Sequence, residues 1–73
     1  MNKELLFMVF CVEEYKNQKN MTDSDVIALF DKYSVFEYLN SSYETLHIKK
    51  LKEVINLIDL FIDDCKIDIK EDI

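Results

Sequence analysis

The chain has 73 residues without a single glycine or proline, and its 15 acidic and nine basic side chains give a net charge of −6. Tight hairpin turns depend on glycine and rigid corners on proline, so this composition disfavours β architectures and favours helices joined by short polar connections. A hydrophobic fraction of 49% also excludes a disordered chain. We therefore predict one all-α domain over residues 1–73, folded as a compact bundle of three to four short helices.

The first helix is predicted from about Lys3 to Gln18. By helical spacing, one apolar face of it is formed by Leu5, Met8, Val9, Val12 and Tyr15. Further apolar residues extend this surface nearly all round the helix, namely Leu6, Phe7, Phe10 and Cys11. A helix that is apolar on all sides is expected at the centre of a fold or in an interface.

The second helix is predicted from about Asp23 to Tyr33, with Thr22 as its N-cap. Its inward residues are expected to be Val26, Ile27, Leu29, Phe30 and Tyr33. Ser34 and Glu37 match the Ser-x-x-Glu capping box, which predicts the start of a third helix at Ser34. This helix ends near Asn40 or continues to Leu46.

The fourth helix is predicted from about Lys49 to Cys65, with a regular apolar stripe along one side. The stripe comprises Leu51, Val54, Ile55, Ile58, Phe61, Ile62 and Cys65. Leu57 and Leu60 lie off the stripe and widen the apolar surface. Residues 66–73 form a charged tail that we expect to fray. We also expect the first and last helices to pack together.

Catalytic, cofactor-binding and metal sites are not expected. A phosphate-binding loop, an EF-hand and a nucleophile elbow all need glycine. His47 is the only histidine, and Cys11 and Cys65 lie far apart in the chain, without the close spacing of a zinc site. We expect His47 at the junction of the last two helices and both cysteines as free thiols rather than a disulfide.

Nucleic acid and membranes are not expected partners. The nine basic residues are all lysine, whereas arginine is the preferred ligand of phosphate and guanine edges. The apolar run from Leu5 to Val12 is too short for a membrane span of about 20 residues, so we expect a cytoplasmic protein. The acidic balance suits either solubility or a basic partner.

Several stretches resemble a family of short bacterial proteins of the clostridial type, known only as a domain of unknown function. The resemblance covers about residues 3 to 63. It is carried by Glu4, Phe7, Cys11, Glu14, Tyr15, Lys16, Leu29, Phe30, Lys32, Tyr33, Val35, Tyr38, Tyr43, Glu44, Leu46, His47 and the run from Ile58 to Ile62.

The resemblance implies no activity and no catalytic residues. Members of that family are often encoded near an ADP-ribosyltransferase-like protein, which implies a toxin–antitoxin pairing. The sequence departs from the family pattern at Ile48–Lys50, where threonine or glycine is usual, and at Asn56-Leu57, where an acidic pair is usual.

The function expected from the sequence is a non-enzymatic protein-interaction module, since the first and fourth helices carry more apolar surface than a small bundle hides. The candidate contact residues are Phe7, Phe10, Leu57, Leu60 and Phe61, each of which also fits a core position. The partner is a second copy of the chain or, more specifically, a toxin covered by an antitoxin-like protein. The alternative is a small helix-turn-helix regulator, although its third helix would bring Glu37 and Glu44 against DNA phosphates.

Overall fold

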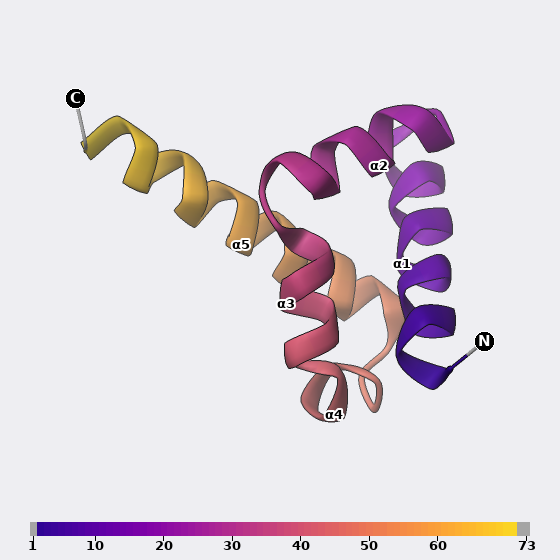
Figure 1. Cartoon of the computed structure of the whole chain (residues 1–73). Helices are drawn as coiled ribbons and strands as arrows, with labels where there is room; N and C mark the ends of the chain where they lie inside the picture. The colour runs from indigo at the N-terminus through magenta and orange to yellow at the C-terminus, as the bar shows by residue number, and fades with distance from the viewer. Residues whose placement is uncertain (1, 72–73) are drawn as a thin grey trace.

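The structure is a computed structural model that describes the backbone of residues 2–71 and the side chains of residues 2–66. It contains five helices: α1 (Lys3–Lys19), α2 (Asp23–Lys32), α3 (Val35–Ser41), α4 (Tyr43–Leu46) and α5 (Leu51–Glu71). Figure 1 shows α1, α2 and α3 gathered around the first half of α5, while the last turns of α5 extend beyond them. The all-α bundle is confirmed.

Both ends of α1 are closed by asparagine. The side chain of Asn2 accepts a hydrogen bond from the Leu5 amide at 2.7 Å. At the other end Asn20 adopts the left-handed conformation, with φ 59° and ψ 43°, and its amide donates to the Lys16 carbonyl. Glycine usually occupies this position, and asparagine is the side chain that best replaces it. The helix therefore ends within one residue of its predicted boundary without a glycine.

The predicted N-cap of α2 is confirmed, and the predicted capping box of α3 is wrong. The Thr22 hydroxyl accepts a hydrogen bond from the Asp25 amide at 3.1 Å. Ser34 instead lies in the left-handed region at φ 58° and makes no side-chain cap bond. A capping box needs an extended N-cap residue, because only then does the hydroxyl face the free amides of the first turn. Ser34 serves as a tight joint between α2 and α3.

The segment predicted as the third helix forms two helices, one ending near Asn40 and one ending at Leu46. Helix α3 ends at Ser41, Ser42 breaks the helical path, and α4 adds one further turn up to Leu46. Helix α5 then begins at Leu51, two residues later than predicted, and continues to Glu71, beyond the predicted end at Cys65. The side chains of residues 67–73 lie outside the described part of the chain, so the fraying expected of residues 66–73 stays a prediction.

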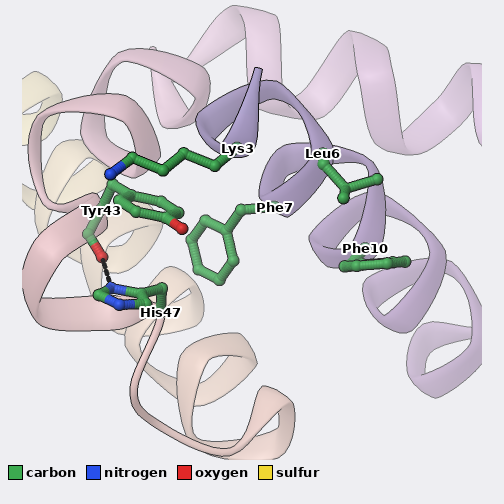
Figure 2. A pocket seen from close by; sticks show the side chains of 6 residues that line it. All are labelled: Lys3, Leu6, Phe7, Phe10, Tyr43 and His47. Atoms are coloured by element: carbon green, nitrogen blue, oxygen red, sulfur yellow. Dashed lines mark hydrogen bonds between the residues drawn. The ribbon is translucent and has the colours of Figure 1, made fainter. Parts of the chain in front are cut away.

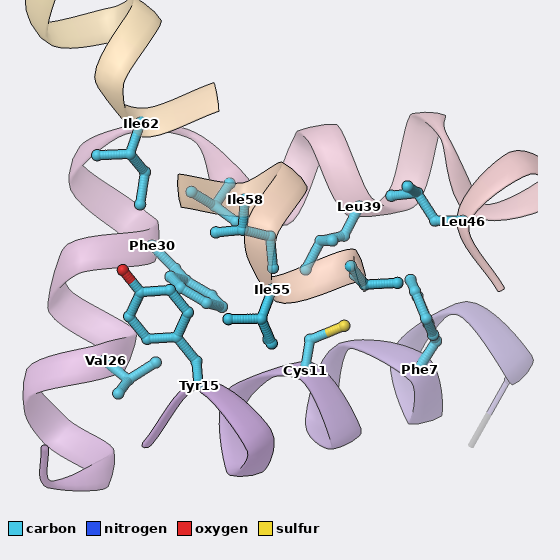
Figure 3. Packing of buried hydrophobic residues seen from close by; sticks show 12 residues of the cluster. Phe7, Cys11, Tyr15, Val26, Phe30, Leu39, Leu46, Ile55, Ile58 and Ile62 are labelled. Atoms are coloured by element: carbon cyan, nitrogen blue, oxygen red, sulfur yellow. The ribbon is translucent and has the colours of Figure 1, made fainter. Parts of the chain in front are cut away.

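The core lies where α1, α2, α3 and the first half of α5 meet (Figure 3). Its largest fully buried side chains include Phe30, Leu39, Ile55 and Ile58. The complete buried cluster is Phe7, Cys11, Tyr15, Val26, Phe30, Val35, Leu39, Leu46, Val54, Ile55, Ile58 and Ile62. The predicted packing of the first helix against the last is confirmed, because α1 contacts α5 as well as α2 and α3.

The apolar face that helical spacing indicates for the first helix is only partly buried. Phe7, Cys11 and Tyr15, spaced by four residues, form its buried side, whereas Leu5 and Val9 are 46% and 42% exposed. The helix is apolar on nearly every side, so its pattern did not distinguish the side that packs. In α2 the prediction fails at one position, Ile27, which is 48% exposed.

Candidate functional site: the outer face of α1

Four large apolar side chains are exposed together on the N-terminal half of α1. Leu5, Leu6, Val9 and Phe10 are 46%, 45%, 42% and 50% exposed, and we call them the outer face of α1. Residues four apart lie one above the other on a helix, so Leu5–Val9 and Leu6–Phe10 form two adjacent ridges. The core residues Phe7 and Cys11 anchor the opposite side of the same two turns.

One flank of the outer face is an aromatic hollow of about 220 Å³ between α1 and α4 (Figure 2). It is lined by Lys3, Leu6, Phe7, Phe10, Tyr43 and His47. The Tyr43 ring lies at its centre, stacked on His47 at 4.4 Å and edge-on to Phe7 at 5.5 Å. The Lys3 ammonium lies 5.5 Å from the centroid of the same ring, so the cation-binding face of Tyr43 is already used within the chain.

His47 lines this aromatic hollow and packs against the Tyr43 ring. Its Nδ1–H donates to the Tyr43 carbonyl at 2.8 Å, which fixes the imidazole against the tyrosine ring. His47 follows α4 directly and precedes α5, so its predicted place at a helix junction is confirmed. Its contacts are those of a packing residue, with no carboxylate or nucleophile among the residues that line the hollow.

The other flank is a more apolar hollow of about 330 Å³ between α1, α2 and α3. It is lined by Leu5, Met8, Val9, Val12, Glu13, Asp23, Ile27 and Phe36. The two carboxylates at its rim both pair with Lys16, at 3.5 Å to Glu13 and 3.3 Å to Asp23. These carboxylates raise the pKa of Lys16, Asp23 more strongly than Glu13, so the Lys16 ammonium stays charged at neutral pH.

The two hollows differ from a pocket for a small molecule. Such pockets are concave, enclose about 300–1,000 Å³ and combine apolar walls with convergent polar groups. Here one hollow is below that range and the other is at its lower limit, with its polar groups paired at the rim.

A polar cluster ties the C-terminal end of α1 to α5, away from the outer face. The Tyr15 hydroxyl donates to Asp59 Oδ1 at 2.8 Å, and Lys19 Nζ lies 2.7 Å from Asp59 Oδ2. Burial, together with the hydrogen bond to Asp59, raises the pKa of Tyr15 and keeps its hydroxyl protonated. The cluster is a structural link, because each of its polar groups is already satisfied by another.

Cys11 is an inert thiol. It is fully buried in the core, and burial raises its pKa to about 12, far above that of a reactive cysteine. Cys65 is half-buried and also free. Among the described residues, no three histidine, cysteine or acidic side chains are grouped as metal ligands would be. No helix within the described residues combines the length and apolarity needed to cross a membrane.

The structure does not bring the five candidate contact residues together. Phe10 and Leu60 are exposed, on α1 and α5 respectively. Leu57 and Phe61 are half-buried against the core, with Phe61 stacked on Tyr38 at 4.5 Å. Phe7 is only 8% exposed and serves mainly as a core residue beneath the aromatic hollow.

Leu5 and Val9 are absent from the candidate contact residues, because the sequence analysis placed them on an apolar face of the first helix without distinguishing which side packs. A usable signal was present in the spacing of Phe7, Cys11 and Tyr15. Three apolar residues separated by four positions mark one side of a helix over its full length, whereas the Leu5–Val9 ridge runs into Glu13 after two turns.

A comparison with protein families matches residues 6–64 to the family described as Protein of unknown function (DUF3791). The chain belongs to this family. No curated protein and no solved structure matches the chain. The family match spans both ridges of the outer face except Leu5, together with every residue of the buried cluster.

Proposed function

We propose that this DUF3791 protein is a non-enzymatic protein-interaction module that binds another protein through the outer face of α1. The observation that carries the proposal is the contiguous exposure of Leu5, Leu6, Val9 and Phe10 at 42–50% each. Single exposed apolar residues are common on soluble proteins, but a contiguous set on one helix is typical of a binding surface.

The energy available from this surface supplies part of what a stable complex needs. Full burial of a large apolar side chain contributes about 1.5–3 kcal/mol, so covering the exposed half of each contributes about 1 kcal/mol. Association also loses translational and rotational freedom, which these four residues alone do not offset. Side chains of the partner that enter the two flanking hollows would supply further contact area.

The test is capture of partners from the native host with the tagged full chain, in parallel with two matched variants. Phe10→Glu places a charge in the outer face at a half-exposed position, so the fold should tolerate it. Leu60→Glu makes the same kind of change at an exposed leucine of α5. We expect wild type and Leu60→Glu to capture the same protein and Phe10→Glu to lose it.

The captured protein must then bind the purified chain directly, as measured by calorimetry. Direct binding that Phe10→Glu abolishes and Leu60→Glu preserves would support the proposal. Equal binding by both variants would overturn it, as would the absence of any captured protein together with the absence of self-association.

A more specific form of the proposal is an antitoxin-like protein that covers a toxin. It is supported by the resemblance to proteins encoded near an ADP-ribosyltransferase-like protein. The expected result is that the captured protein is such a transferase and that added wild-type chain, but not Phe10→Glu, inhibits it. A captured protein of another class would contradict the antitoxin form of the proposal and leave the interaction module as the proposed function.

No structural observation favours the helix-turn-helix alternative. Helix α3, at the place of a recognition helix, has seven residues, and Glu37 is its one charged side chain. A carboxylate opposite phosphates weakens binding to DNA. We expect no retardation of DNA at low salt, and a salt-sensitive complex in that assay would instead support the regulator.

A further inference from the structure

We propose that the outer face of α1 binds a second copy of this chain, with the two α1 helices antiparallel. The inference deepens the proposed function and rests on it, because it assigns an occupant to the same surface. It is carried by the order of residues along α1. A lysine lies before the apolar ridges and glutamates lie directly after them, at Lys3 and at Glu13 and Glu14.

In an antiparallel dimer, the lysine end of each apolar surface lies against the glutamate end of the other. When two identical helices cross head to tail at the middle of the ridges, Leu5 and Leu6 of one copy meet Val9 and Phe10 of the other. An interface around a twofold axis contains each such contact twice. The ridges formed by residues four apart are the surfaces that interlock when two helices pack.

The same arrangement brings opposite charges together at both ends of the interface. Lys3 of each copy lies level with the end of the apolar run of the other copy, within side-chain reach of its Glu13. A parallel arrangement would place Lys3 against Lys3 and Glu13 against Glu13, and the helix dipoles would then also repel. The charges therefore favour one orientation of the partner, and the partner that carries the complementary order is this chain.

The two charged side chains are exposed, and each would exchange contacts within the chain for one across the interface, Lys3 leaving the face of the Tyr43 ring as well. Lys3 is 64% exposed at the side chain and has a weak ion pair, 3.9 Å from Glu44. Glu13 is 51% exposed at the side chain and has a surface contact to Lys16 at 3.5 Å. Exposed pairs of this kind contribute little each, so exchanging them for contacts across the interface costs little.

The flanking hollows provide room for the side chains of the second copy. The larger hollow borders Leu5 and Val9, and the aromatic hollow borders Leu6 and Phe10. In the antiparallel arrangement Phe10 of one copy lies close to Leu6 of the other, beside the aromatic hollow. Aromatic rings placed edge to face there would add to the apolar contact.

The experiment is sedimentation equilibrium on the purified, untagged full chain over a wide concentration range. We expect wild type and the control Leu60→Glu to form dimers, whereas Phe10→Glu and Leu6→Lys stay monomeric with unchanged helical circular dichroism. Two outer-face variants are used so that one variant failing to fold leaves the test intact. A wild type that is monomeric throughout would overturn the inference, as would dimers that persist in both variants.

A charge exchange tests the orientation. Lys3→Glu alone, or Glu13→Lys alone, should weaken the dimer about tenfold, because each change turns two symmetry-related attractions into repulsions. The double variant Lys3→Glu/Glu13→Lys should restore the affinity of the wild type. Failure of the double variant to recover, with both single variants weakened, would contradict the antiparallel arrangement.

The outcomes separate this inference from the proposed function. A monomeric wild type that binds a captured protein through Phe10 would overturn the inference and retain the interaction module. A dimer sensitive to Phe10 that captures nothing else would support the inference and make self-association the role of the surface. A monomer that captures nothing would overturn both.

Discussion

Helices α1 and α5 contain similar numbers of large apolar residues, yet only α5 shows in its sequence which side it buries. Within the described side chains of α5, the four buried residues all belong to the predicted stripe, namely Val54, Ile55, Ile58 and Ile62. The first turns of α1 have no charged residue between Leu5 and Val12, and the helix buries Phe7, Cys11 and Tyr15, of which only Tyr15 belongs to the apolar face indicated by helical spacing. An apolar pattern identifies a buried face only where polar residues contrast with it.

The largest expected effect tests the side of α5 that the pattern predicted. Ile58 is fully buried and Leu60 is 60% exposed, although only one residue separates them. Ile58→Ala should lower the free energy of unfolding by about 4 kcal/mol, because it leaves a cavity in the core. Leu60→Ala should lower it by less than about 1 kcal/mol. Urea unfolding of both variants measures the difference, and similar losses would contradict the assigned faces of α5.

The corresponding pair in α1 tests a side that the pattern did not predict. Phe7 is 8% exposed and Phe10 is 50% exposed. Phe7→Ala should lower the free energy of unfolding by about 3 kcal/mol. Phe10→Ala should lower it by about 1 kcal/mol when it is measured at concentrations too low for self-association. A greater loss for Phe10→Ala than for Phe7→Ala would contradict the assigned buried side of α1.

The inner side of α1 should also make the protein sensitive to alkali. Burial raises the pKa of Cys11 from 9.0 to about 12, so above pH 9 the unfolded chain loses this proton while the folded chain keeps it. The free energy of unfolding should therefore fall with rising pH over this interval, by at most about 1.4 kcal/mol per pH unit for the thiol. Above pH 10 Tyr15, whose pKa is also raised, adds to the slope.

Two variants assign this alkaline slope to its groups. Cys11→Ala should be less stable at neutral pH but show a flatter decline from pH 9. Tyr15→Phe should flatten the decline above pH 10, since it removes the ionisable hydroxyl and its bond to Asp59. Thermal unfolding followed by circular dichroism over pH 7–11 checks both, and slopes equal to that of the wild type would contradict the burial of this side.

The smallest expected effects compare the same substitution at the end of α1 and inside α5. Asn20 holds the left-handed position that ends α1, whereas Asn56 is exposed in the middle of α5. Asn20→Ala should lower the free energy of unfolding by about 1 kcal/mol, because alanine disfavours that conformation. Asn56→Ala should raise it by about 0.5 kcal/mol, because alanine is the better helix former. Chemical denaturation would show effects of opposite sign, and effects of equal sign would count against the assigned end of α1.

The parts of the fold that depend on local chemistry were predictable from the sequence. Thr22 caps α2 as its hydroxyl and the following acidic residues indicate, and the stripe of α5 faces the core. The sequence also indicated that α1 carries more apolar surface than the bundle hides. These features depend on residues that are neighbours in the sequence, which is why they could be predicted from it.

The remaining features depend on contacts between distant residues. Ser34 matches a capping box in sequence, but the packing of α2 against α3 requires a left-handed residue there, which turns its hydroxyl away. Leu57 lies off the predicted stripe and is nevertheless half-buried against the core, as is Phe61 of the stripe, which stacks on Tyr38. Which residues of α1 are exposed likewise depends on how α2, α3 and α5 pack against it.

The two thiols differ in solvent accessibility, so the rates at which they react with a labelling reagent can report the opening of the core. Cys11 has no solvent-accessible surface, and Cys65 is half-buried on a different helix. A thiol-reactive dye should label Cys65 in the folded chain and reach Cys11 only when α1 detaches from the bundle. The rate of the slow labelling step then reports how often the core opens, and the fast step serves as an internal reference in the same sample.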